Sequence, residues 1–162
     1  MRMISGDNKF TAIDCALKTG ILSPDEVNGH NVVMIGKDFR DLVGGVKPSK
    51  DKNGEITLKV EKFANFKTVA KTLKVLARAT PADKLTMVVG LKELGNAVAM
   101  TADGINDVEA LRNANVGICM GITGCDAAKE ASDMIILDDD IKSVYKAVQW
   151  GRNMHANIRK FI

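Results

Sequence analysis

Short apolar runs recur along this chain, and each one ends in a polar turn that leads into a helical pattern. These runs occupy positions 31–35, 75–77, 98–100, 116–120 and 134–137. Between them, apolar residues are spaced three and four apart, as on one face of a helix. Regular alternation of strand and helix is typical of α/β domains with a parallel sheet. We therefore predict an α/β fold with a doubly wound parallel sheet and no internal repeat.

The composition favours an aliphatic interior. Of the 162 residues, 46% are hydrophobic but only 4% are aromatic, which suits buried parallel strands better than a sandwich. The net charge of +3 is too small to indicate nucleic acid, so we expect no nucleic-acid partner. The three cysteines lack metal-ligand spacing, which indicates a reducing compartment. No apolar run approaches the roughly 20 residues of a membrane helix, so we expect this segment itself to be soluble.

Both ends of the chain indicate a fragment. Met1–Ser5 has the pattern of a strand that has lost its beginning, and the final helical pattern from Ile141 shows no stop signal at Ile162. Asp138–Asp140 precedes that helix; the triplet could bind a cation, but we expect it to cap the helix. The lysine-rich segment 46–62 predicts an exposed loop or a hairpin turning at Asn53-Gly54, with its charges in solvent.

Several helices show a clear apolar face. The residues that we expect to point inward in the first three are Phe10, Ile13 and Leu17, then Phe63, Phe66, Ala70 and Leu73, and then Leu85, Val88 and Leu91.

The stretch Val98–Leu111 predicts a strand that ends in a polar loop and continues into a helix. Asp103, Asn106 and Asp107 stand in that loop. The carboxyl ends of parallel strands are where ligands bind in such folds, and Mg²⁺ prefers oxygen ligands. A solvated turn has the same composition, so this string alone leaves both interpretations open.

Two earlier strand ends carry groups that could hold phosphate. Ser5-Gly6-Asp7-Asn8 places a hydroxyl and backbone amides before a helix, which indicates either an anion site or a plain helix cap. Arg78 follows the strand at 75–77, and Lys84 lies in the first turn of the helix that Pro81 opens. A lysine in the first turn of a helix is unfavourable because of the helix dipole, and binding of a phosphate would explain its presence there. A lysine that is simply solvated remains the more common explanation for a single position.

A hydroxyl, a lysine and paired carboxylates are the parts of a phosphoryl-transfer site. The nucleophile is missing, because no aspartate follows a strand in a DxT-like or DxD-like loop. Asp138–Asp140 does follow a strand, but at the wrong place in the order.

Three segments in this order resemble the P-type ATPases of the haloacid-dehalogenase-like superfamily. "MISGDNKFTAIDCALKTGI" is similar to MxTGDNxxTAxxIAxxxGI, "LARATPADK" to xARxxPxxK, and "TADGINDVEAL" to TGDGxNDxPAL. The resemblance covers essentially the whole chain. "VLARATPADK", the lysine-rich insertion, "AKEASDMIILDDDIKSV" and "WGRN" look closest to plasma-membrane-type calcium pumps.

The resemblance implies an organisation and a set of roles. Residues 1–150 correspond to the C-terminal part of the phosphorylation domain, lacking the first strand with its nucleophilic aspartate, and 151–162 to the start of the stalk helix. Mg²⁺ is the implied cofactor and ATP the substrate. The implied phosphate and nucleotide contacts are Ser5, Gly6, Asp7, Arg78, Lys84 and Asn106, the implied metal ligands are Asp103 and Asp107, and the implied catalytic residues are Lys84, Asp103 and Asp107.

The resemblance also implies partners and a location. They are the nucleotide, actuator and transmembrane domains of a pump at the cytosolic face of a plasma membrane or a vacuolar or other endomembrane. Calmodulin would bind through a segment outside this chain. Without the nucleophile, we expect this chain alone to be inactive.

Two other functions remain open. One is a soluble phosphatase of the same superfamily, and the other is a truncated, non-catalytic module that binds Mg²⁺ and phosphate. Ala102 stands where the family has glycine. If that position required a positive φ or a very close approach of the backbone, its β-carbon would cost on the order of 1 kcal/mol or more, which would fit the module.

Overall fold

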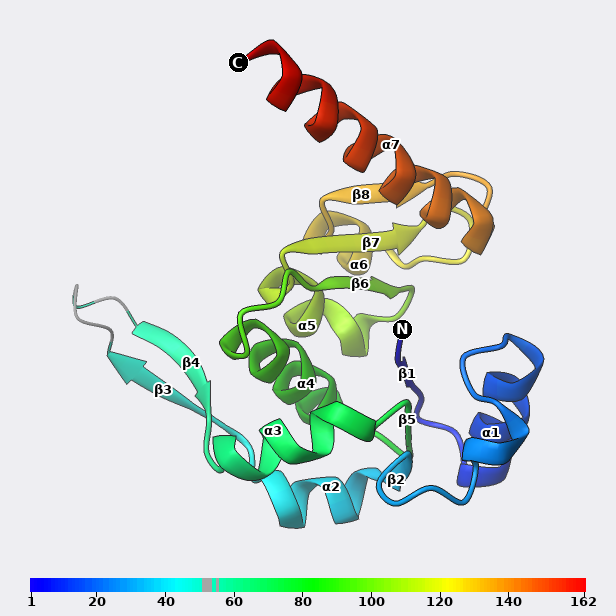
Figure 1. The fold of residues 1–162 in the computed structure, drawn as a ribbon, viewed down its shortest axis with the longest axis vertical. Helices are drawn as coiled ribbons and strands as arrows, with labels where there is room; N and C mark the ends of the chain where they lie inside the picture. The colour runs from blue at the N-terminus through cyan, green and yellow to red at the C-terminus, as the bar shows by residue number, and fades with distance from the viewer. Residues whose placement is uncertain (51–53, 55) are drawn as a thin grey trace. The chain divides into compact units, whose positions relative to one another are not determined.

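The computed structural model describes residues 1–50, 54 and 56–162 (Figure 1). The chain divides into two compact units. The first comprises residues 1–98 with 113–115, and the second comprises residues 99–112 with 116–162. Each unit is described by itself.

The first unit is built on a parallel sheet in the order β1-β5-β2. Its strands are β1 (Met3–Ile4), β5 (Val75–Ala77) and β2 (Val33–Ile35). Successive side chains of a strand point to opposite faces, and β5 shows this clearly. Val75 and Ala77 belong to one buried cluster, whereas Leu76 belongs to another. Helices therefore cover both faces of this small sheet.

α1 (Lys9–Lys18) covers the Val75 side of the sheet. Asn8 begins this helix by accepting a hydrogen bond from the Thr11 amide at 2.9 Å, and Gly20 follows its end with φ +72°. Ala12 and Ala16 form its buried side. The predicted burial of Phe10 is wrong, because its side chain is 83% exposed. Phe10 lies two residues before Ala12, about 200° around the helix, and so points away from the sheet.

α2 (Gly36–Val43), α3 (Phe63–Thr72) and α4 (Pro81–Glu93) cover the Leu76 side. The predicted inward residues of α3 and α4 are confirmed for Phe66, Leu85 and Val88, which are buried. Phe66 packs edge-on against Phe39 of α2, with ring centroids 6.4 Å apart. Ser23 and Pro24 open a 3₁₀ turn, η1 (Pro24–Glu26).

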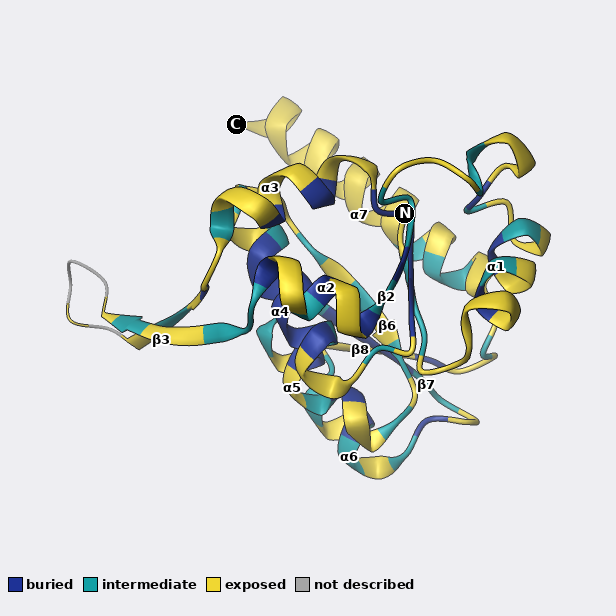
Figure 2. Cartoon of the chain, turned by 90° about the horizontal axis from the view of Figure 1, so that it is seen from below, coloured by how far each residue is buried: buried dark blue, intermediate teal, exposed yellow. Residues whose placement is uncertain are grey.

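The lysine-rich segment forms a hairpin rather than an irregular loop. β3 (Val46–Lys50) and β4 (Ile56–Val60) pair antiparallel, with Val46 opposite Val60 and Lys50 opposite Ile56. Much of its surface is exposed, while Val60 is buried in the core cluster (Figure 2). The predicted turn at Asn53 lies outside the described residues.

The second unit holds another parallel sheet, in the order β6-β7-β8. Its strands are β6 (Ala99–Ala102), β7 (Val116–Met120) and β8 (Met134–Ile136). α5 (Val108–Asn113) and α6 (Asp126–Ala131) contribute Leu111 and Ala128 to a core cluster with Cys119 of β7. β6 extends two residues beyond the predicted strand, so Thr101 and Ala102 are extended rather than part of the loop.

The parallel α/β architecture is therefore confirmed, but not as a single sheet. Among the described residues, the strands pair as two separate three-stranded parallel sheets and one hairpin. β1 pairs only with β5, and β6 pairs only with β7, so each of them is an end strand of its sheet among the described residues.

The last element, α7 (Ile141–Phe161), begins as predicted at the acidic triplet. Asp140 accepts a hydrogen bond from the Lys142 amide at 2.9 Å, and Asp138 accepts one from the Ser143 hydroxyl at 2.7 Å. None of the 21 helical residues is buried. In the described part of the chain, no helix combines the length and the hydropathy needed to cross a bilayer.

Candidate functional site

Ser5 and Asp7 form a closed turn directly after β1. The Ser5 hydroxyl donates to Asp7 Oδ2 at 2.8 Å and accepts from the Asp7 amide at 3.1 Å. Ser5 thus caps this turn, whereas Asn8 caps α1. The tetrapeptide Ser5–Asn8 therefore does contain a plain helix cap, but Asn8 rather than Ser5 provides it. Its hydroxyl and the Asp7 carboxylate stay near the carboxyl end of β1.

The structure places this turn beside the segment that follows β5. The Arg78 amide donates to the Asp7 carbonyl at 2.8 Å, and the Ala79 amide donates to the Ser5 carbonyl at 2.9 Å. Arg78 has φ +49°, a left-handed conformation that is uncommon for a side chain of its size. The two segments predicted to contact phosphate, around Ser5 and around Arg78, are therefore joined by backbone hydrogen bonds.

Lys84 lies one turn further along, in the capped start of α4. The Thr80 carbonyl accepts the Asp83 amide at 3.0 Å and the Lys84 amide at 3.2 Å. The Thr80 hydroxyl also accepts the Asp83 amide at 3.4 Å, and the Asp83 carboxylate accepts the Thr80 amide at 2.8 Å; these two hydrogen bonds form a capping box. The Asp83 and Lys84 amides are therefore already hydrogen-bonded within the start of the helix. Lys84 is half-buried.

The remaining predicted residues belong to the second unit. Asp103 directly follows β6 and is exposed, and its backbone carbonyl accepts the Cys125 amide at 2.9 Å. Asn106 and Asp107 lie in the 3₁₀ turn η2 (Ile105–Asp107). Asp107 is 5% exposed, and its amide donates to the Gly104 carbonyl at 3.1 Å. The turn brings one exposed and one buried carboxylate into one short loop.

The chemistry of this loop fits Mg²⁺. Mg²⁺ binds one or two carboxylates and completes its octahedral shell with waters and phosphate oxygens, so Asp103 and Asp107 suffice on the protein's side. A β-carbon at Gly104 would meet the Asp107 carboxylate at 3.8 Å, an ordinary van der Waals distance, so packing alone does not require glycine at this position. Among the described residues there is no group of three or more histidine, cysteine or acidic side chains that could hold a metal alone.

Known proteins resemble this chain over its whole length. It is 44% identical over 162 residues to calcium-transporting ATPase 9, plasma membrane-type, from Arabidopsis thaliana. It is 41% identical over 167 residues to the plasma membrane calcium-transporting ATPase mca-1 from Caenorhabditis elegans. Both matches cover 100% of this chain. The chain is homologous to plasma-membrane-type calcium-transporting ATPases.

The chain spans only 13% of the length of the Arabidopsis calcium-transporting ATPase and 12% of that of the Caenorhabditis one. No family model matches it. Among solved structures it is similar to the catalytic domain of the CPx-ATPase CopB-B, with a TM-score of 0.45 and 24% identity, covering 64% of this chain and 56% of that one.

Ala102 departs from the glycine of the P-type ATPase signature without backbone strain. It is the last residue of β6 and does not have a positive φ. Its partner in the ladder is Cys119 of β7. The cost that a left-handed backbone would impose on alanine therefore does not arise in this structure.

A loop beside Asp103 is held by Asp139, which has φ +50°. Its carboxylate accepts the Ile122 amide at 2.9 Å, the Thr123 amide at 2.7 Å and the Thr123 hydroxyl at 2.8 Å. Partial burial raises the pKa of Asp139, but these hydrogen bonds outweigh it and hold the pKa below the ordinary value of 3.8. Asp139 is thus charged at neutral pH and organises this loop.

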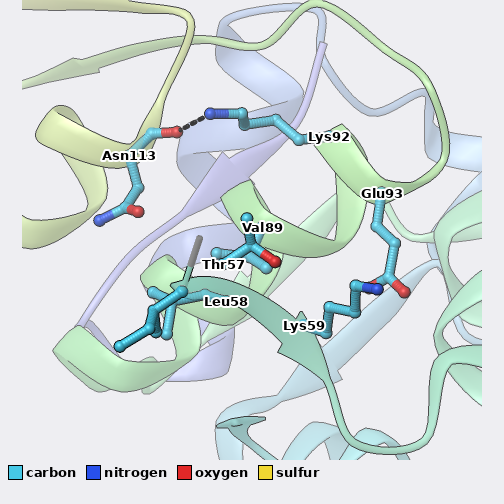
Figure 3. A pocket seen from close by; sticks show the side chains of 8 residues that line it. Thr57, Leu58, Lys59, Val89, Lys92, Glu93 and Asn113 are labelled. Carbon is cyan, nitrogen blue, oxygen red and sulfur yellow. Dashed lines mark hydrogen bonds between the residues drawn. The ribbon is translucent and has the colours of Figure 1, made fainter. Parts of the chain in front are cut away.

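A groove of about 390 Å³ lies between the hairpin and α4 (Figure 3). Two of its three charged side chains form hydrogen bonds: Lys92 donates to the Asn113 carbonyl at 2.6 Å, and Glu93 accepts the Val60 amide at 3.1 Å. None of the predicted site residues lines this groove.

Sequence reasoning missed Arg40, Gly36 and Asp83. Arg40 of α2 forms an ion pair with Asp83, whose side chain is only 1% exposed. Gly36 lies against both, because a β-carbon there would be 2.8 Å from the Asp83 carboxylate and 3.2 Å from the Arg40 guanidinium. Thr80-Pro81-Ala82-Asp83 carries a readable capping-box signal, but its partner Arg40 is 43 residues away.

Proposed function

We propose that this chain is a part of an ATP-driven calcium pump and supplies residues that form and hydrolyse its aspartyl phosphate. The observation that carries this proposal is homology to calcium-transporting ATPases along the whole chain, at 41% identity or more in both relatives named above. The three signature segments fall at the carboxyl ends of strands, as ligand-binding segments of α/β domains do.

In this proposal, the first unit binds phosphate and nucleotide. Ser5, Gly6 and Asp7 contact the phosphate and nucleotide, Arg78 contacts the nucleotide, and Lys84 stabilises the transferred phosphoryl group. Support comes from the backbone hydrogen bonds that join the Ser5 turn to the Arg78 segment. A cation placed beside the phosphoryl oxygens offsets the charge that develops during transfer.

The second unit would hold the metal. Asp103 and Asp107 are the proposed Mg²⁺ ligands, and Asn106 supports the phosphate. When bound, Mg²⁺ neutralises charge on the phosphoryl oxygens. Asp107 is buried, so its position is set by packing, whereas exposed Asp103 is accessible to a metal that arrives with the nucleotide.

The nucleophilic aspartate would come from a strand that is not in this sequence. An end strand offers unpaired backbone groups to a further strand, and β1 and β6 are such strands. We propose that the nucleophile strand completes the haloacid-dehalogenase-like sheet at such an edge. The purified chain should then release no phosphate from ATP, and steady hydrolysis would contradict this proposal.

The remaining elements of the proposal concern the whole pump. Residues 1–150 would form the C-terminal part of its phosphorylation domain, and 151–162 would begin the stalk helix. Nucleotide, actuator and transmembrane domains would be the partners, and calmodulin would act through a segment outside this chain. The domain would lie at the cytosolic face of a plasma membrane, a vacuolar membrane or another endomembrane.

The reading frame around this sequence tests the proposal directly. We expect it to encode a DKTGT strand upstream of Met1 and membrane helices on both sides. In that longer protein, calcium should stimulate formation of an acid-stable phosphoenzyme, and Asp103→Ala should abolish it. A stop codon just upstream of Met1 would instead favour the non-catalytic module.

A further inference from the structure

We infer that Arg40 and Asp83 are positioning residues that hold the 78–84 segment, and with it Arg78 and Lys84, in the conformation that binds phosphate. The inference rests on the proposed function for the identity of the ligand. Arg40 lies outside the sequence signatures on which that function depends, and Asp83 occupies a position of the "LARATPADK" segment that the xARxxPxxK pattern leaves unspecified.

Asp83 is a buried carboxylate at the start of α4. Its side chain is 1% exposed, and Oδ2 accepts hydrogen bonds from the Thr80 amide at 2.8 Å and the Thr80 hydroxyl at 2.9 Å. The same oxygen accepts a hydrogen bond from Nη1 of Arg40. A buried carboxylate is stable only when it is paired and hydrogen-bonded, and here all three donors meet one oxygen.

Arg40 connects this cap to another element of the first unit. It lies in α2, 43 residues away, and Nη1 also approaches the Thr80 hydroxyl at 3.4 Å. Its side chain remains 41% exposed, so it reaches the cap from the surface. Removing Arg40 would leave the Asp83 charge buried without its cation, and the cap would have to move toward water.

The cap stands between Arg78, which is proposed to contact the nucleotide, and Lys84, which is proposed to stabilise the phosphoryl group. Thr80 follows Arg78 by two residues, and Lys84 follows Asp83 directly. The Arg78 carbonyl packs where Gly36 has no side chain, because a β-carbon there would lie 2.5 Å from that oxygen. The left-handed Arg78 backbone is thus held on one side by Gly36 and on the other by the Asp7 carbonyl.

Asp83 also complements the helix dipole of α4. Lys84 lies in the first turn, where a cation is unfavourable, and the Asp83 carboxylate is the acidic group of that turn.

A purely structural ion pair would lower global stability when broken but would not single out this segment. The matched control is the Lys74–Glu26 ion pair of the same unit, with 2.6 Å between Nζ and Oε2. Arg40→Met and Lys74→Met each remove one cation and keep an unbranched side chain. Arg40→Lys keeps the charge but loses the forked geometry, and serves as a partial rescue.

The test uses the 162-residue chain and two readouts by amide NMR. The first is hydrogen exchange without ligand. Arg40→Met should accelerate exchange at the Asp83 and Lys84 amides by at least about tenfold relative to Lys74→Met, with Arg40→Lys in between. Equal exchange in Arg40→Met and Lys74→Met would overturn the inference. Should Arg40→Met fail to fold, Asp83→Asn replaces it, since asparagine keeps the shape and removes the charge.

The second readout is titration with inorganic phosphate. In the unaltered chain, the Arg78 and Lys84 amides should shift, and the midpoint should rise several-fold in Arg40→Met but not in Lys74→Met. An unchanged midpoint would overturn the inference. If the unaltered chain shows no phosphate response, the proposed function fails, and the exchange readout still decides whether Arg40 and Asp83 position the segment.

Discussion

The carboxylate of Asp139 holds Thr123 through two hydrogen bonds, from its backbone amide at 2.7 Å and from its hydroxyl at 2.8 Å. Two residues further on, the Cys125 amide donates to the Asp103 carbonyl at 2.9 Å. Asp139 is therefore connected through one short loop to a proposed ligand of Mg²⁺.

Asp139→Asn should lower the stability of the chain at neutral pH. Asparagine tolerates the left-handed backbone, so the change removes the charge and weakens the hydrogen bonds without new strain. Because the folded-state pKa of Asp139 lies below 3.8, its stabilising contribution is present above that pH and is lost as the pH falls below it. Urea unfolding followed from neutral pH to about pH 3 should therefore show a steeper acid loss in the unaltered chain. Glu130→Gln provides the control, because Glu130 of α6 is exposed. If Asp139→Asn and Glu130→Gln show the same dependence of unfolding free energy on pH, the role of Asp139 is contradicted.

Gly90→Ala should destabilise the first unit, although alanine is the better helix former. A β-carbon at Gly90 would overlap the ring of Phe66, which is 0% exposed and cannot move aside cheaply. We expect a loss of about 1–3 kcal/mol from overpacking, which outweighs the propensity gain of about 1 kcal/mol.

Gly151 of α7 gives the matched control, because a β-carbon there meets nothing within 4 Å. Gly151→Ala should raise helix content or leave stability unchanged, as measured by circular dichroism and urea unfolding. Equal effects of the two substitutions would show that the Gly90–Phe66 contact does not decide the outcome.

The three thiols should differ in reactivity. Cys15 is exposed, Cys125 is half-buried and Cys119 is 0% exposed. Burial raises the pKa of the Cys119 thiol, and thiolate is the reactive form. A chromogenic disulfide reagent at mild alkaline pH should label Cys15 first and Cys119 only after unfolding. Cys15→Ser should remove the fastest phase, and a fast phase that persists would refute this order.

Much of the local structure could be predicted from the sequence. β7 at Val116–Met120 lies where its apolar run places it, because polar residues or glycine bound that run on both sides. For the segment 46–62, the sequence allows either a loop or a hairpin. The pairing of Val46 with Val60 shows that it is a hairpin. Helix caps at Asp140 and Thr80 also follow from short polar signals before apolar runs.

What could not be predicted depends on contacts between distant segments. Phe10 fits a helical apolar stripe, yet the sheet selects Ala12 and Ala16 instead. The pairing of strands into two sheets and the Arg40–Asp83 ion pair are also non-local. For the candidate site, the residue types and their positions at strand ends could be predicted. The Ser5 turn, the left-handed backbone of Arg78 and the hydrogen bonds of Asp139 to the 122–123 loop are seen only in the structure.

The most direct test of the proposed function is a titration of the chain with Mg²⁺ in the presence of inorganic phosphate, followed by amide NMR. We predict saturable shifts at Asp103, Asn106 and Asp107 that are lost in Asp103→Ala. They should be retained in Asp126→Ala, which removes another exposed carboxylate of the same unit. A folded chain without shifts at 103–107, or shifts that survive Asp103→Ala, would contradict the proposal that these residues bind the metal.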